Sequence, residues 1–296
     1  MHLEMLSLHQ YVLDFSNGTR NYFTLCGDHL TVPMFWSGLS AFCVLLGIFA
    51  SVVVLRKLCQ RHRQNISTND FFVFNLTIID LVFLICLPFS VYNYMLLHNS
   101  EFEYFNNFTY SLPICGRPLF MACVCGDYYF AVVHPIIYIN SRRTAIIRKV
   151  IAVTIWLFII CFGLLLVIYP WIFTTTFTST PLFISLLVIG FCDVSVLQAL
   201  RKPDPSGKSN IHPQKKRALR TIINSFILTF TAYLPPVLIF SFGHNLPIRF
   251  EMYYCILIFI AICSTVSGGV IMPFLYLESI GQLNIQHIVA KIKLRR

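Results

Sequence analysis

Charge is scarce in this chain of 296 residues: Asp, Glu, Lys and Arg together make up 11% of it, whereas apolar residues make up 57%. Acidic residues are the rarer kind, with 12 Asp and Glu against 22 Lys and Arg. Soluble domains usually carry about a quarter charged residues, so this composition leaves little room for one. It is the composition of an integral membrane protein.

The sequence also lacks the residue sets on which enzymes depend. It has no nucleophile with a partner base, no phosphate-binding glycine loop, and no cysteine and histidine spacing typical of a metal site. No basic run alternates with aromatic residues in the manner of a nucleic-acid surface. We therefore expect no catalytic residue, no cofactor, no metal and no nucleic-acid partner, and we predict that the chain is not an enzyme.

Seven long apolar stretches fill most of the chain. Each is long enough to cross a hydrocarbon core of about 30 Å as a helix that rises about 1.5 Å per residue. The sequence predicts an all-α membrane protein, a seven-transmembrane helix bundle in the lipid bilayer. The stretches are Pro33–Leu55, Phe71–Tyr94, Phe105–Val133, Val150–Ile172, Pro181–Leu200, Ala218–Phe242 and Met252–Leu277.

The basic residues indicate how the bundle is oriented. Nineteen of the 22 Lys and Arg fall in four patches, which follow the first, third, fifth and seventh stretches: Arg56–Arg63, Arg142–Lys149, Arg201–Arg220 and Lys291–Arg296. Because cytoplasmic loops retain Lys and Arg, we predict an extracellular N-terminus and a cytoplasmic C-terminus. The net charge of +10 is explained by this topology beside an anionic inner leaflet.

These boundaries divide the chain into three parts. We expect an extracellular tail over residues 1–32, a seven-transmembrane domain over 33–277 and a cytoplasmic tail over 278–296. The last part places Ile280, Ile285 and Ile288 on one helical side, which favours a short amphipathic helix on the inner membrane surface. A disordered tail is the alternative.

Two pairs of residues on the predicted outer side can be modified. Cys26 in the tail and Cys255 at the start of the seventh span are the two cysteines on the oxidising side, and we hypothesise a disulfide between them, with two free thiols as the alternative. Asn17 and Asn107 begin outer glycosylation sequons. Asn17 is the preferred acceptor, since Asn107 lies close to the predicted membrane.

Two charged residues lie deep within the predicted spans. Asp80 comes nine residues after the start of the second span and Arg117 comes eleven residues before Tyr128, so both lie roughly 14–16 Å or more above the inner face. A charge at this depth requires a partner or a wet cavity. We expect the Asp80 carboxylate and the Arg117 guanidinium to meet, and an Arg117 that reaches a water-filled cavity alone is the alternative. Asp193, nearer the inner end, can be satisfied by water or the basic loop.

Motifs along the spans resemble those of the rhodopsin-like G-protein-coupled receptors. The third span ends in G-D-Y-Y-F-A-V-V-H-P at residues 126–135, similar to the D-R-Y end of the family's third helix. The resemblance covers about Pro33 to Leu283. Its other motifs are N-L-T-I-I-D-L at 75–81, L-P-F at 87–89, Trp156, L-P at 234–235 and P-F-L-Y at 273–276.

The resemblance implies a function and a set of site residues. The chain is expected to bind an extracellular ligand and to signal across the plasma membrane to a heterotrimeric G protein. The G-protein-facing inner switch would comprise Asp127, Tyr128, Tyr129, Pro273 and Tyr276. Pro235 and Pro236 would mark a hinge in the sixth span, with a static kink as the alternative.

The chain departs from the family pattern at several of these positions. Tyr128 replaces the arginine of the D-R-Y motif, Ser51 stands where an asparagine is usual, and Met272 replaces the asparagine before the proline of the seventh span. The count from Tyr128 puts the family's outer cysteine position near Glu103, and the short second outer loop, about Phe173–Thr180, has no cysteine either. The family's usual disulfide is therefore missing at both ends.

The same count puts Arg117 where the family lines a sodium pocket around the second-helix aspartate, here Asp80. We expect the Arg117 guanidinium to replace the sodium ion as a tethered cation.

Two other functions remain open at the level of sequence. With the departures at Tyr128, Ser51 and Met272, the protein is alternatively a receptor-like decoy or scaffold that does not signal. A small transporter is the third reading, but it predicts related halves, and the sequence shows no internal repeat.

Overall fold

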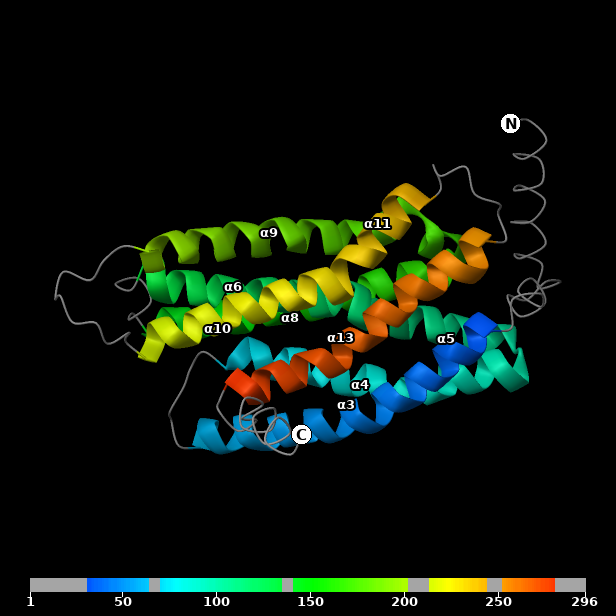
Figure 1. Ribbon diagram of the computed structural model, residues 1–296, viewed down its shortest axis with the longest axis horizontal. Coiled ribbons are helices and arrows are strands. Elements are labelled where there is room, and N and C mark those ends of the chain that lie inside the picture. Colours follow the sequence, from blue (N-terminus) through cyan, green and yellow to red (C-terminus); the bar gives the residue numbers. More distant parts are fainter. Residues whose placement is uncertain (1–30, 64–69, 135–140, 202–212, 244–251, 280–296) are drawn as a thin grey trace, which may run out of the picture.

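The computed structural model of the chain describes residues 31–63, 70–134, 141–201, 213–243 and 252–279, and these residues form helices without a β-strand among them. Seven helical segments are long and apolar enough to cross a membrane, so the predicted all-α bundle of seven spans is confirmed. Figure 1 shows the segments lying roughly along one long axis. The predicted tail helix after Ser279 and residues 1–30 lie outside the described residues.

Three of the spans are single α-helices: the first is α3 (Thr31–Arg63), the fourth is α8 (Ser141–Ile168) and the fifth is α9 (Thr176–Arg201). The other four are built from more than one element. The second joins α4 (Phe71–Tyr92) to the π-helical η2 (Asn93–Leu97). The third consists of α5 (Ser100–Ser111), η3 (Leu112–Gly116) and α6 (Arg117–Val133), the sixth of α10 (Pro213–Leu228), η5 (Thr229–Tyr233) and α11 (Leu234–Phe242), and the seventh of η7 (Tyr253–Leu257) and α13 (Ile258–Ser279).

Helices form here because a lipid interior offers backbone groups no other partner. Several hydroxyl side chains inside the spans bond to their own helix. Thr77 Oγ1 donates to the Val73 carbonyl at 2.8 Å, and Ser185 Oγ donates to the Pro181 carbonyl at 2.7 Å. These hydroxyl groups are therefore satisfied without contact to another helix.

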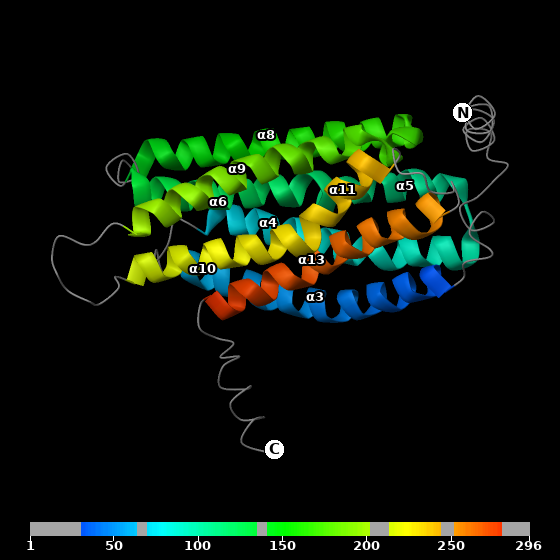
Figure 2. The same ribbon diagram turned by 45° about the horizontal axis from the view of Figure 1, so that its top comes forward.

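The third span occupies the middle of the bundle. Side chains are buried at 83% of its most apolar window, against 33% for the first, fourth and fifth spans. It packs against α9 on one side and α4 on the other, while α3 packs between α4 and α13 (Figure 2). Residues of the third span are thus within reach of most other spans.

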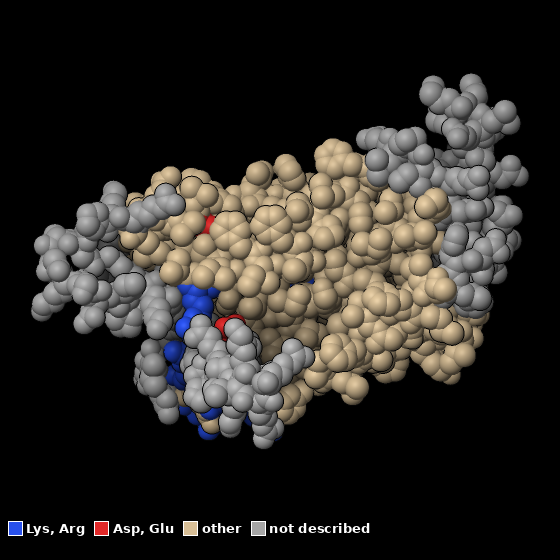
Figure 3. All heavy atoms as spheres, viewed as in Figure 1, with Lys and Arg blue, Asp and Glu red and all other residues tan. Residues whose placement is uncertain are grey.

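Several predicted boundaries differ from the structure. The second outer loop was expected over about Phe173–Thr180, but α9 begins at Thr176 and a short 3₁₀ helix, η4 (Pro170–Thr174), fills the connection. Hydroxyl groups stabilise this earlier start, since Thr178 Oγ1 donates to the Ile172 carbonyl at 2.8 Å. The first basic patch, Arg56–Arg63, is also not a loop but the last turns of α3. Figure 3 shows Lys and Arg side chains gathered at this end of the molecule.

Candidate functional site

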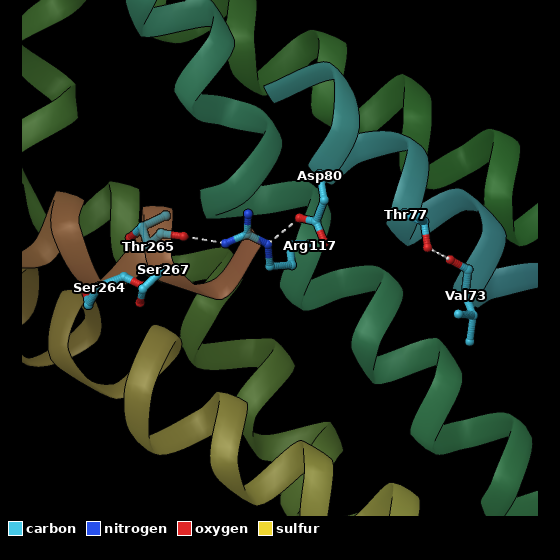
Figure 4. Close-up of polar contacts among 7 residues, drawn as sticks. All are labelled: Val73, Thr77, Asp80, Arg117, Ser264, Thr265 and Ser267. Atoms are coloured by element: carbon cyan, nitrogen blue, oxygen red, sulfur yellow. Dashed lines mark hydrogen bonds and ion pairs between the residues drawn. The ribbon is translucent and has the colours of Figure 1, made fainter. Parts of the chain in front are cut away.

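The two deeply placed charged residues lie in contact at the centre of the bundle. Asp80 belongs to α4, Arg117 is the first residue of α6, and both side chains are 0% exposed. Arg117 Nε donates to Asp80 Oδ1 at 2.6 Å (Figure 4). The structure thus brings together the carboxylate and the guanidinium that the sequence places at the same depth.

A backbone carbonyl of the seventh span is the second partner of Arg117. Arg117 Nη1 donates to the carbonyl oxygen of Thr265 in α13 at 2.5 Å (Figure 4). The hydroxyl of Thr265 is occupied elsewhere, since Oγ1 donates to the Ala261 carbonyl at 2.7 Å. One side chain therefore ties three spans together. Sequence reasoning missed Thr265 because a backbone acceptor leaves no signal in residue type.

Two glycines of α13 make room for the guanidinium. A Cβ added to Gly268 would lie 2.7 Å from Arg117 Nη1 and 2.8 Å from the Cβ of Ala232 in η5. A Cβ added to Gly269 would lie 3.0 Å from Arg117 Nη2. The absence of side chains at both positions lets α13 approach the arginine closely, and the sixth span packs against the same place.

The chain just before Arg117 also depends on a close approach. The π-helical turn η3 ends at Gly116, where a Cβ would lie 2.7 Å from Ile159 Cδ1 and 2.8 Å from Ile79 Cδ1. The second and fourth spans therefore press against the third at this residue. Pro113 lies inside this turn and Pro118 is the second residue of α6, so each of the two elements lacks one backbone donor. Arg117 thus starts its helix directly after a residue that is closely packed by two neighbouring spans.

At the inner end of the third span, Asp127 pairs with a residue of the fourth span. Arg148 Nε in α8 lies 3.1 Å from Asp127 Oδ1, and Arg148 is only 8% exposed. From sequence, Arg148 belongs to a basic patch that indicates topology. In the structure its side chain is also buried against Asp127, which residue type and position alone do not reveal.

The two tyrosines that follow Asp127 lie between spans. Tyr128 and Tyr129 pack against a small apolar cluster centred on Val196 of α9 and Ile222 of α10. The hydroxyl of Tyr129 also lies 3.4 Å from His134 Nε2. At the position of the family's arginine, the chain thus has an apolar contact between the third, fifth and sixth spans.

The inner part of the seventh span is held by the first. Pro273 lies inside α13, and the buried Tyr276 accepts a hydrogen bond at its hydroxyl from Arg61 Nη1 of α3 at 3.3 Å. Arg61 also lies 3.3 Å from Asp70 Oδ2. Arg61 is a second member of a basic patch whose structural role sequence reasoning missed. Met272, one of the departures from the family pattern, is buried in the core.

Two motif residues from the second and fourth spans meet directly. Trp156 Nε1 donates to Asn75 Oδ1 at 3.1 Å, and Asn75 Nδ2 donates to the Phe71 carbonyl at 2.9 Å. Ser51, which stands where the family has asparagine, is 0% exposed in α3. The Trp156 and Asn75 pair fixes the fourth span against the second.

Pro235 and Pro236 lie at the start of α11, directly after the π-helical η5. The sixth span bends between α10 and α11 (Figure 1). Both prolines and the π-helical turn interrupt regular α-helical bonding, so the bend has a local cause. The hinge at Pro235 and Pro236 stays a prediction.

The predicted modifications fall partly outside the described residues. Cys255 is disulfide-bonded, and the nine other cysteines within the described ranges are free thiols. The proposed partner Cys26 and the sequon at Asn17 lie outside those ranges, so the pairing and the glycosylation stay predictions. Asn107 lies half-buried in α5. Within the described part of the chain, no group of three or more His, Cys, Asp or Glu could hold a metal ion.

The central ion pair predicts an asymmetry between single and double replacements. Arg117→Ala leaves a buried carboxylate without its cation and should cost about 3–5 kcal/mol of stability. Removing both charges in Asp80→Ala/Arg117→Ala should cost less than Arg117→Ala alone. Thermal unfolding of the purified protein in lipid nanodiscs measures the difference. Losses that simply add in the double variant would contradict a coupled pair.

The glycine contacts predict a steric effect with a matched control. Gly268→Ala puts a methyl group against Arg117 and Ala232, so we expect a loss of about 1–3 kcal/mol. Gly190→Ala in α9 meets nothing within 4 Å and should be neutral or slightly stabilising, as alanine favours helices. The same unfolding assay compares the two, and equal effects would show that the close approach at Gly268 is unimportant.

Comparison with known proteins places these features in a family. A sequence model described as "7 transmembrane receptor (rhodopsin family)" matches residues 50–180. The chain is 26% identical over 236 residues to the C-X-C chemokine receptor type 5 of Homo sapiens, an alignment that covers 64% of this chain and 57% of that receptor. It is 26% identical over 216 residues to the hydroxycarboxylic acid receptor 1 of Homo sapiens, covering 65% of this chain and 61% of the relative.

A third relative is matched over a longer stretch. The lysophosphatidic acid receptor 4 of Homo sapiens is 24% identical over 271 residues, which cover 78% of this chain and 70% of the relative. The alignments to the first two relatives span less than two thirds of those proteins. Seven spans, the motif residues in contact and the matched sequence model agree with one another, and over residues 50–180 the chain is similar to the rhodopsin family of seven-transmembrane receptors.

Proposed function

We propose that this chain is a plasma-membrane receptor that binds an extracellular ligand and signals to a heterotrimeric G protein. In this proposal the N-terminus is extracellular and the end that carries the basic side chains faces the cytoplasm (Figure 3). The match of residues 50–180 to the rhodopsin-family model supports the proposal, as do relatives that are themselves receptors. Their names refer to a chemokine, a hydroxycarboxylic acid and lysophosphatidic acid, so they favour a receptor and no single ligand.

The observation that carries the proposal is that three spans are hydrogen-bonded together at the centre of the bundle, while the neighbouring sixth span is interrupted. Arg117 holds α4, α6 and α13 together through Asp80 and the Thr265 carbonyl. The sixth span packs against this centre at Ala232, and it is interrupted there by η5 and then by two prolines. Three spans held together beside one interrupted span would allow the inner half of the sixth span to adopt two arrangements. A ligand can shift the population between such arrangements.

Tyr128 is the position at which signalling is tested most directly. Tyr128→Arg restores the charge found in the family beside Asp127, but it removes a ring from the contact with Val196 and Ile222. We expect the unaltered protein in nanodiscs to accelerate nucleotide exchange on at least one class of G protein, and Tyr128→Arg to accelerate it further. Tyr128→Phe keeps the ring and serves as the control, with exchange unchanged. A lack of exchange in all three proteins would favour the decoy or scaffold.

If the Arg117 guanidinium serves as the cation of Asp80, the stability of the protein should not depend on sodium. Because the Arg117 guanidinium occupies the side of Asp80 that a free cation would neutralise, replacing potassium by sodium at equal ionic strength should leave the unfolding temperature unchanged. In Arg117→Met the carboxylate has no fixed cation, so sodium should then stabilise the protein. Sodium stabilisation of the unaltered protein that disappears in Asp80→Asn would contradict the proposal.

A further inference from the structure

A third buried charge, Asp193, lies in the inner half of the bundle. It belongs to α9 and is 4% exposed. Ser225 Oγ of α10 hydrogen-bonds to Asp193 Oδ2 and also lies 2.9 Å from the Ile222 carbonyl oxygen of its own helix. The expectation that water or the basic loop would satisfy Asp193 is thus incomplete, since a side chain of the sixth span reaches it.

The Ser225 hydroxyl, which bonds to Asp193, is a neutral group. In the described ranges the ion pairs join Arg61 to Asp70, Arg117 to Asp80 and Arg148 to Asp127, and none of them involves Asp193. A buried carboxyl group without a cation depends on its hydrogen bonds, because a lost donor leaves an acceptor unsatisfied in an apolar place. The contact with Ser225 is therefore costly to break while α9 and α10 stay together.

The surrounding contact between these spans is apolar. Val196 of α9 and Ile222 of α10 are buried together, with Tyr128 and Tyr129 against them. Apolar contacts have little directional preference and tolerate sliding, whereas a hydrogen bond fixes distance and angle. Asp193 therefore sets the register in which α10 meets α9.

The opposite side of α10 is bonded to the seventh span. Arg220 Nη1 donates to the Glu278 carbonyl at 2.9 Å, and Asn224 Nδ2 donates to the Leu275 carbonyl at 3.2 Å. The inner half of the sixth span is thus held on two sides below the break at η5. An outward movement of α10 from α9 must break the Ser225 contact.

We propose that Asp193 and Ser225 form a clasp that keeps the inner half of the sixth span closed against the fifth, so that the clasp sets how often the inner face opens. The signalling consequence of this inference rests on the proposed function, whereas the clasp itself concerns only the position of α10 against α9. Asp193 and Ser225 act on the inner face by positioning α10.

Hydrogen exchange tests the clasp without any G protein. In the full chain in nanodiscs, Ser225→Ala should lower the protection of amides in residues 213–228 about tenfold, the effect of losing a hydrogen bond to an acidic group. Ser195→Ala is the matched control, because the Ser195 hydroxyl donates only to the Phe191 carbonyl of its own helix at 2.8 Å. Asp193→Ala should act like Ser225→Ala, because it removes the acceptor of the same contact.

Nucleotide exchange on the same variants separates the two proposals. Faster amide exchange confined to 213–228, with a basal nucleotide exchange raised about tenfold, supports the clasp and the receptor function together. Faster amide exchange without any nucleotide exchange supports the clasp and counts against the receptor function. Unchanged protection in both Ser225→Ala and Asp193→Ala overturns the clasp. Protection lost equally in all seven spans also overturns it, since the effect would then be general destabilisation.

Discussion

A charge inside a bilayer has to be neutralised from within the protein, and the contact between Asp80 and Arg117 is where this chain meets that requirement. Both groups are shielded from solvent, so neither can be removed without stranding the other. The arrangement of the surrounding spans follows from it. Gly268 and Gly269 bring the seventh span against the guanidinium, and Gly116 lets the second and fourth spans close over the residue before it. The centre of the bundle is therefore packed around one side chain.

Away from the centre, the inner end depends on polar contacts between pairs of spans. Arg148 holds the third and fourth spans together through Asp127, and Arg61 reaches from the first span to Tyr276 of the seventh. The side chains of both arginines thus fasten neighbouring helices. Tyr128 gives the third span an apolar contact at the position where the D-R-Y motif has an arginine.

Much of the bundle is predictable because helices that cross a membrane have fixed length and rise. The seven spans follow from apolar length, and the meeting of Asp80 and Arg117 follows from depth. Both depth counts, from Phe71 and from Tyr128, run through continuous α-helix, so they keep their register. The count from Tyr128 to Glu103 crosses the π-helical η3, which adds a residue to a turn and changes the facing side. Partners such as the Thr265 carbonyl, Arg148 and Ser225 depend on how helices rotate about their axes, which composition and spacing do not encode.

The separation of Asp80 and Arg117 along the chain has a consequence for biosynthesis. The two residues are 37 positions apart on consecutive spans, so the carboxylate leaves the ribosome first and its cation follows one helical hairpin later. Each charge alone disfavours entry of its span into lipid by about 2.5–3.5 kcal/mol, whereas the hairpin carries both charges in a neutral pair. The second and third spans are thus best inserted as one unit. The ion pair that ties the second and third spans in the mature bundle therefore also favours their joint entry into the membrane.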